Sequence, residues 1–327
     1  MICPFCLMEN SIFPVKEGRY VCIKSCGHPI SSEYYNGRYP KLSVGAVGQR
    51  GHGKTMYLTS LFYALDWLMN SPDFWHDFYY QAHDPESLKL LTSCLANLRK
   101  GELPPATCEV FPTPTLIKFR HLPLLGCSDT YDIAFYDTGG EVFNDERVLK
   151  IGTQGRFMSR VSVAWFLVSL PNIEKSGEPI AQTMSTFLNK YLMGLKDVLN
   201  YRPKDQHLIV VLTKADELQD PWVSEFLDSD RAEEWPPSAR TLVSNSYEVS
   251  DWLERKGCRG FLKAARAEFR SVEFCMVSAL GARPADDRRI DPNLIKPKRV
   301  LEPFFWVLLK TDRSLLDRLW RFFHKRR

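Results

Sequence analysis

The stretch GQRGHGKT at residues 48–55 lies between an alternating apolar segment, KLSVGAV, and an apolar-rich segment, MYLTSLFYALDWLMN. It matches the phosphate-binding pattern GxxxxGK[ST], in which a strand, a glycine-rich loop and a helix follow one another. Glycines let the loop backbone wrap around a chain of phosphates, and the helix N-terminus favours negative charge. We expect contacts with a nucleotide from Gly48, Arg50, Gly51, His52, Gly53, Lys54, Thr55 and Met56.

Two side chains at the end of this loop have predicted roles. Lys54 contacts the terminal phosphates and is the first candidate for a catalytic residue, while the Thr55 hydroxyl holds Mg²⁺. The segment YDIAFYDTGGE at residues 131–141 follows as an alternating strand that ends in DTGG. There, Asp137 reaches Mg²⁺ through water, and the N–H of Gly140 senses the γ-phosphate.

Two later segments predict how a base is held. HLIVVLTKAD at residues 207–216 ends in TKAD, where Asp216 accepts two hydrogen bonds from guanine and the stem of Lys214 covers the base plane. Adenine presents a mismatched edge and leaves that carboxylate unpaired, which is the source of selectivity. In VEFCMVSALG, residues 272–281, the Ala279 N–H contacts the guanine oxygen. The predicted site also includes Thr213, Ser278 and Leu280.

Four of the nine cysteines cluster near the N-terminus in a CxxC and a CxxxC pair. Two thiolate pairs close a tetrahedral metal site from opposite sides, and a short segment with few aliphatic residues needs such a metal to fold. We expect a zinc ribbon with the ligands Cys3, Cys6, Cys22 and Cys26. His28 is the rival of Cys26 for the fourth position, and four free thiols are the alternative. Because no basic stripe with interleaved aromatics accompanies the pattern, nucleic-acid binding is not indicated.

The motifs GQRGHGKT, DTGG, TKAD and SAL stand in the order found in Ras-like GTPases of the translation-factor-related group, which the chain resembles over residues 41–281. The resemblance implies GTP and GDP as ligands and Mg²⁺ as cofactor, and an adenine-nucleotide P-loop protein is the alternative. More narrowly, the cysteine ribbon, the long segment before DTGGE and the apolar tail resemble bacterial double-GTPase families predicted to act in multi-component defence systems.

The same group needs a threonine between the phosphate loop and DTGG that reports the γ-phosphate to Mg²⁺. Thr107, in LPPATCEV, is the first candidate for this second protein ligand of Mg²⁺. Thr113 and Thr115 are its rivals.

Two departures from the group's pattern bear on hydrolysis. Glu141 takes the place of the water-orienting glutamine and is the second candidate for a catalytic residue, since a carboxylate can polarise water. Arg50 replaces a small residue, where it either crowds an incoming arginine finger or neutralises phosphate charge itself. We therefore expect slow intrinsic turnover that a partner or self-association accelerates. A finger is available from Arg147, Arg156 or Arg160, with solvated surface charges as the alternative.

The fold we expect is α/β, with a mostly parallel sheet, helices on both faces and the ligand at the carboxyl ends of the strands. We place a zinc ribbon at residues 1–38, the P-loop GTPase domain at 39–282, and a connector with an amphipathic helix at 283–327. Residues 217–249, rich in charge, proline and serine, predict an irregular insertion. The C-terminal helix packs on the domain's own surface, and an anionic membrane or a partner is the alternative.

Composition limits the functional classes. Lys and Arg total 43 and Asp and Glu total 39, a net charge of +4 that demands no acidic partner. The longest apolar run, VSVAWFLVSL, is too short to cross a bilayer, and the cysteine count suits reduced thiols, so we expect a soluble, cytoplasmic protein.

Together these observations predict a GTP-binding switch that hydrolyses GTP slowly and signals to a protein partner. A scaffold with a structural nucleotide pocket, which binds partners through its ribbon and C-terminal helix, is the alternative from another class. A nucleic-acid-associated GTPase guided by its ribbon is a further alternative.

Overall fold

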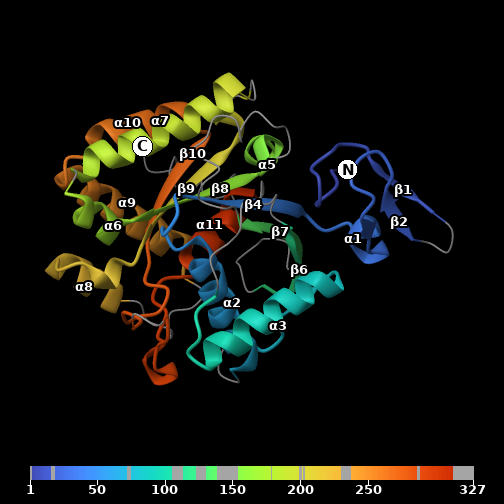
Figure 1. The fold of residues 1–327 in the computed structure, drawn as a ribbon, viewed down its shortest axis with the longest axis horizontal. Coiled ribbons are helices and arrows are strands. Elements are labelled where there is room, and N and C mark those ends of the chain that lie inside the picture. Colours follow the sequence, from blue (N-terminus) through green and yellow to red (C-terminus); the bar gives the residue numbers. More distant parts are fainter. Residues whose placement is uncertain are drawn as a thin grey trace.

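The computed structural model describes most of the chain, and Figure 1 shows how its elements are arranged. The described residues are 2–15, 19–71, 75–104, 113–122, 130–137, 154–177, 179–198, 201, 203–229, 237–285 and 288–311. Among them, no helix combines the length and apolar content that a bilayer crossing requires.

A central sheet organises the described part of the chain, with its seven strands in the order β10-β9-β8-β4-β7-β6-β5. The strands are β4 (Lys41–Val47), β5 (Tyr79–Ala82), β6 (Thr115–Arg120), β7 (Tyr131–Asp137), β8 (Val163–Ser169), β9 (His207–Thr213) and β10 (Ser271–Met276). Neighbours from β10 to β7 pair in parallel, whereas β6 runs antiparallel to β7 and β5. The chain therefore leaves β4, β7, β9 and β10 at one edge of the sheet, and each of these strands leads into one of the four predicted motifs.

Helices cover both faces of the sheet (Figure 1). They are α2 (Lys54–Asn70), α3 (Pro85–Arg99), α5 (Gln154–Arg160), α6 (Leu170–Ser176), α7 (Ile180–Met193), α8 (Pro221–Asp228), α9 (Ala239–Arg255), α10 (Arg259–Glu268) and α11 (Glu302–Thr311). Strand β7 shows how one strand serves both faces: Phe135 packs into the core beneath α2, α3 and α11, and Tyr136 packs into the core beneath α5, α7 and α10. Both faces are apolar because both are covered. This confirms the predicted α/β fold.

Several short helical turns connect these elements. They are a π turn at Gly194–Val198 and 3-10 turns at Pro203–Asp205, Ala215–Glu217 and Pro292–Leu294.

The prediction of an irregular insertion at residues 217–249 was wrong. The structure has helix α8 there, followed by the first turns of α9. Some of the residues that suggested a loop in fact begin helices: Pro221 stands in the first turn of α8, which Asp220 caps, and Ser238 caps α9 through the N–H of Thr241. Residues 230–236 lie outside the described part. Proline is well tolerated at this position because the N–H it lacks would have no partner there.

Helix α11 is buried almost all round. Phe304, Phe305 and Val307 are fully buried in the same core as β4, β8 and β9, and the Trp165 indole of β8 donates a hydrogen bond to the Pro303 carbonyl. A helix that is apolar on every side belongs in a core rather than on a surface. The segment up to residue 311 is thus packed against the sheet, whereas the basic residues after it lie outside the described part. The division of the chain at residues 38 and 282 stays a prediction.

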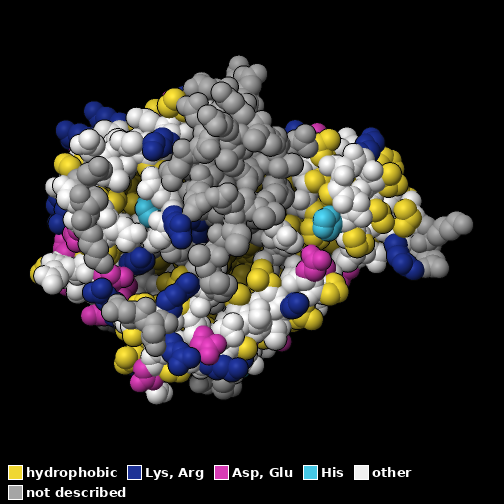
Figure 2. Space-filling model, in the orientation of Figure 1, with side chains coloured by type: hydrophobic (Ala, Val, Ile, Leu, Met, Phe, Trp, Pro, Cys, Tyr) yellow, Lys and Arg dark blue, Asp and Glu magenta, His cyan; other side chains and the backbone are white. Residues whose placement is uncertain are grey.

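The N-terminal segment forms a small three-stranded antiparallel sheet and a short helix. Its elements are β1 (Ile12–Pro14), β2 (Tyr20–Cys22), β3 (Pro29–Ile30) and α1 (Ser32–Asn36). We call residues 2–30 the ribbon. Its inner side chains, including Phe5 and Leu7, share a hydrophobic core with Ala134 and Tyr136 of β7. Hydrophobic side chains also gather on its outer surface (Figure 2), where Phe13, Val15 and Ile23 are exposed.

Candidate functional site

The loop after β4 has the backbone that its glycines predict. Gly51 and Gly53 adopt left-handed φ values of 81° and 79°, and Gly53 precedes the first residue of α2. A Cβ on Gly48 would lie 2.8 Å from the Leu167 carbonyl oxygen of β8. Glycine is needed at these positions because other residues would strain the turn or collide with the sheet. The loop therefore presents the N-terminus of α2 at the carboxyl edge of the sheet.

His52 attaches the phosphate loop to the core of the domain. Its side chain is buried, packs edge-on against Phe187, and places Nδ1 3.0 Å from the Leu167 carbonyl oxygen. Burial lowers the pKa of His52 to about 4, so the ring is neutral and Nδ1 donates to that oxygen. The Thr213 hydroxyl of the TKAD motif donates to the His52 carbonyl at 2.8 Å. His52 thus faces the core, and any contact it makes with a nucleotide comes from its backbone.

Lys54, Thr55 and Asp137 come together at the start of α2. The Lys54 ammonium donates to the carbonyls of Gly48 and Gln49, at 2.8 and 3.1 Å. Burial lowers the Lys54 pKa to about 8, and the charge of Asp137 only partly opposes this. The Thr55 hydroxyl donates to Asp137 Oδ2 at 2.6 Å across 82 residues of sequence. A hydroxyl and a carboxylate beside a phosphate-binding loop are oxygen ligands of the kind Mg²⁺ prefers, so these residues fit that ion.

A pocket of about 500 Å³ opens where β9 and β10 end. Its lining includes Asp216 and Glu217 as well as Gly281 and Arg283. Lys214 adopts a left-handed φ of 55°, which turns the chain sharply between β9 and the 3-10 turn that carries Asp216. The half-buried Asp216 carboxylate therefore faces a space bordered by the loop after SAL, as a base-recognising group would.

The SAL segment is held by a tight set of backbone contacts. The Ser278 hydroxyl accepts a hydrogen bond from the Gly281 N–H at 2.8 Å, and the Leu280 carbonyl accepts one from the Lys296 N–H at 2.7 Å. Ala279 stands between them, half-buried. Met56 of α2 packs against a small apolar cluster formed by Leu98, Leu280, Ile290 and Ile295. Met56 therefore supports this loop.

Asn172, at the start of α6, was not predicted from the sequence. Its side-chain N–H group donates to the Gly51 carbonyl at 3.2 Å, and its oxygen accepts from the Lys214 ammonium at 3.5 Å. It therefore connects the phosphate loop with the TKAD motif. In the sequence, Asn172 is marked only by its position three residues after a buried strand. The surrounding SLPN resembles an ordinary helix start.

A comparison with known protein families shows which family this chain belongs to. A family model described as Double-GTPase 2 matches residues 42–252, which contain three of the four motifs. The chain belongs to the Double-GTPase 2 family. Membership of this GTPase family supports GTP binding by the site described above, with Mg²⁺ as the usual companion ion. The predicted resemblance to double-GTPase proteins is thereby confirmed.

This Double-GTPase 2 chain was also compared with solved structures and with curated proteins. A chain of the signal recognition particle receptor SRb-GTP/SRX complex from Chaetomium thermophilum is similar to it, with 16% sequence identity and a TM-score of 0.39. The match covers 76% of this chain and 94% of that one. Among curated proteins, none matches significantly.

Several predicted residues of the Double-GTPase 2 site lie outside the described part of the chain. They are Thr107, Gly140, Glu141 and Arg147, together with the side chain of Arg156. Of the rival threonines, Thr113 is exposed and Thr115 is a buried residue of β6. Arg50 is exposed on the phosphate loop, and Arg160 forms an ion pair with Glu9 of the ribbon.

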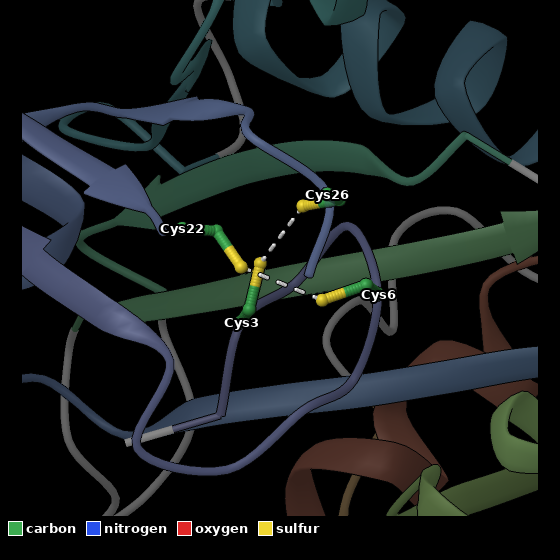
Figure 3. A group of neighbouring side chains, drawn as sticks. All are labelled: Cys3, Cys6, Cys22 and Cys26. Atoms are coloured by element: carbon green, nitrogen blue, oxygen red, sulfur yellow. Dashed lines mark hydrogen bonds between the residues drawn. The ribbon is translucent and has the colours of Figure 1, made fainter. Parts of the chain in front are cut away.

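The four ribbon cysteines converge on one point (Figure 3). Their sulfur atoms all lie within 4.8 Å of one another, with Sγ separations of 3.8 Å for Cys3 and Cys26 and 3.6 Å for Cys6 and Cys22. A zinc ion with four Zn–S bonds of about 2.3 Å has sulfur atoms about 3.8 Å apart, so the group fits such a metal. His28 is not in this group, and its ring stacks on Phe5 instead, with centroids 4.5 Å apart. The geometry therefore favours Cys26 over His28.

The ionisation of the thiols is uneven. Burial raises the pKa of Cys26 to about 11. At Cys22, burial is outweighed by hydrogen bonds from Ser11 and Cys26, which lower the pKa to about 6. A metal would deprotonate all four, since the thiolate is the ligand form.

Proposed function

We propose that this protein binds GTP together with Mg²⁺, hydrolyses it slowly and acts as a nucleotide-dependent switch. The observation that carries the proposal is the convergence of Lys54, the Thr55–Asp137 pair and the Asp216 pocket along one edge of the sheet. These groups match, in order, the terminal phosphates, the Mg²⁺ ion and the guanine base of one nucleotide. Family membership supports the same assignment.

In this proposal each group has a defined task. Lys54, whose ammonium already lies on the loop carbonyls, neutralises charge on the terminal phosphates. Thr55 and Asp137 hold Mg²⁺, which when bound withdraws charge from the transferred phosphoryl group. Asp216 reads the guanine edge, and the backbone at Ala279 meets the guanine oxygen. Glu141 stays proposed as the residue that orients water, and Thr107 as the threonine that senses the γ-phosphate.

Slow turnover is proposed because Glu141 replaces glutamine and because the exposed Arg50 stands on the phosphate loop. We propose that a protein partner or self-association accelerates the reaction. The exposed Phe13, Val15 and Ile23 of the ribbon offer an apolar surface for such a partner. The resemblance to double-GTPase families adds a multi-component defence system as the setting.

The four ribbon cysteines are proposed to hold zinc. Every cysteine that the structure describes is a free thiol, which supports a reducing compartment such as the cytoplasm.

Single-turnover phosphate release from GTP tests the proposed GTP hydrolysis. Slow release is expected in the wild type, strong loss in Lys54→Ala, and unchanged release in Lys196→Ala, an exposed lysine paired with Glu268 on α10. A rate per molecule that rises with protein concentration would support self-association. If GTP binds but no phosphate is released at any concentration, the protein is a nucleotide-bound scaffold.

Protease sensitivity of the segments near Thr107 and between Asp137 and Arg160 should change with nucleotide, and an unchanged pattern would contradict the switch.

A further inference from the structure

The ribbon is attached to the strand that carries the proposed Mg²⁺ ligand. Tyr136 directly precedes Asp137 on β7, and its hydroxyl donates a hydrogen bond to the Pro4 carbonyl at 2.6 Å. Pro4 lies between the cysteines Cys3 and Cys6. The tyrosine is buried, so the bond is shielded from water. Losing such a bond leaves a buried carbonyl unpaired, which is costly.

The two neighbours on β7 face opposite sides of the sheet. Asp137 meets Thr55 on the α2 side, and Tyr136 packs with Phe5 and Leu7 of the ribbon on the other side. Successive residues of a strand point to opposite faces but share a planar peptide unit, so a shift of one displaces the next. The position of the ribbon's first cysteine pair and the position of the Asp137 carboxylate are therefore linked through a single peptide unit.

A second contact joins the ribbon to α5, the helix that follows the DTGGE segment in the chain. Arg160 of α5 pairs with Glu9 of the ribbon. Phe157 of α5 packs on Tyr136, with ring centroids 5.1 Å apart. The same Phe157 ring packs closely on β4, since a Cβ added to Gly45 would lie only 2.4 Å from it. The ribbon thus contacts the elements on both sides of DTGGE.

The start of β7 is connected, through His83, to Ser31, the residue that directly follows the ribbon. Asp132, fully buried, lies 2.7 Å from His83 Nε2, and His83 Nδ1 lies 3.3 Å from the Ser31 hydroxyl that caps α1. The segment that leaves the ribbon is thus attached to the start of β7, and the turn with the first cysteine pair is attached to the end of β7. The ribbon therefore cannot rotate freely against this strand. The ribbon and Ser31 together are packed and hydrogen-bonded against the nucleotide-binding domain at both ends of β7.

We propose that the ribbon is an allosteric part of the nucleotide site, in which metal bound by the four cysteines and GTP·Mg²⁺ bound at Thr55 and Asp137 stabilise each other through Tyr136. The proposal rests on the proposed function. The four cysteines would hold the metal and so fix the Cys3–Cys6 turn, whose Pro4 carbonyl accepts the hydrogen bond that positions Tyr136 and the end of β7. By linkage, GTP·Mg²⁺ must tighten metal binding by the same factor by which metal tightens GTP binding.

The experiment measures the Zn²⁺ affinity of the full chain by equilibrium competition with a chromogenic chelator that selects zinc over Mg²⁺. A non-hydrolysable GTP analogue with Mg²⁺ is expected to raise the Zn²⁺ affinity by about fivefold or more, the lower end of typical allosteric coupling. Tyr136→Phe keeps the ring and removes only the hydroxyl, and it should abolish the nucleotide effect. Tyr191→Phe is the matched control: this buried tyrosine of α7 donates its hydroxyl hydrogen bond to the Gln206 side chain at 2.9 Å rather than to the ribbon, and the variant should keep the full effect.

A direct titration of the analogue into the same samples separates the possible failures. If the analogue does not bind, the proposed function fails and the coupling falls with it. If it binds but leaves the Zn²⁺ affinity unchanged in the wild type, only the coupling is overturned. Retention of the full nucleotide effect in Tyr136→Phe would overturn the assigned route through Tyr136.

Discussion

The lowered pKa of Lys54 predicts how GTP affinity depends on pH. The lysine loses solvent inside the phosphate loop, and its pKa falls from 10.5 to about 8. Only the ammonium form neutralises the terminal phosphates, so above pH 8 binding must take up a proton. The charged fraction of the free protein falls from about 0.9 at pH 7 to about 0.1 at pH 9. The affinity for GTP should therefore fall about tenfold over this range, or about 1.4 kcal/mol.

Titration of a fluorescent GTP analogue at constant ionic strength and Mg²⁺ measures this slope. Lys54→Arg is the control, because a guanidinium stays charged throughout and every other titrating group, including the guanine base, is shared. The difference in slope between the two proteins isolates Lys54. Equal slopes in wild type and Lys54→Arg would refute the reasoning.

Three further predictions concern the frame of the site. Gly281→Ala should lower the free energy of unfolding by about 1–3 kcal/mol in urea titrations, because φ is 79° and the new Cβ would lie 2.3 Å from the Lys296 carbonyl oxygen. Trp306→Ala in α11 should cost about 3–5 kcal/mol in the same assay, whereas Tyr247→Ala, 72% exposed, should change stability by less than about 0.5 kcal/mol; similar losses in both would contradict the buried placement of α11. Cys22→Ser should reduce the zinc content measured by atomic absorption and lower the melting temperature, and full zinc occupancy in this variant would exclude Cys22 as a ligand.

The fold and the order of the site could be predicted because each motif follows a strand whose apolar run is visible in the sequence. GQRGHGKT, DTGG, TKAD and SAL are local patterns with fixed backbone demands, so their meeting at one edge follows from the parallel sheet. The cysteine pairs were equally visible because ligand spacing is local.

What could not be predicted depends on contacts between distant segments. Asn172 links the phosphate loop with Lys214 through a single side chain, with no repeating pattern to announce it. The burial of α11 depends on which face of the sheet the other helices leave uncovered, and the sequence of α11 alone does not specify this. The bond between Tyr136 and Pro4 joins residues 132 positions apart. Helix α8 and the first turns of α9 were missed because proline and serine favour both loops and helix starts.

The most direct test of the central claim is the ratio of GTP to ATP affinity in the presence of Mg²⁺, measured for the wild type and for Asp216→Ala. Two hydrogen bonds to a carboxylate are each worth about 1.5–3 kcal/mol, so the wild type should prefer GTP by about 100-fold or more. In Asp216→Ala that preference should largely disappear, because neither base then meets a charged acceptor. Equal affinity for GTP and ATP in the wild type, or an unchanged preference in Asp216→Ala, would contradict a guanine-selective site at this pocket.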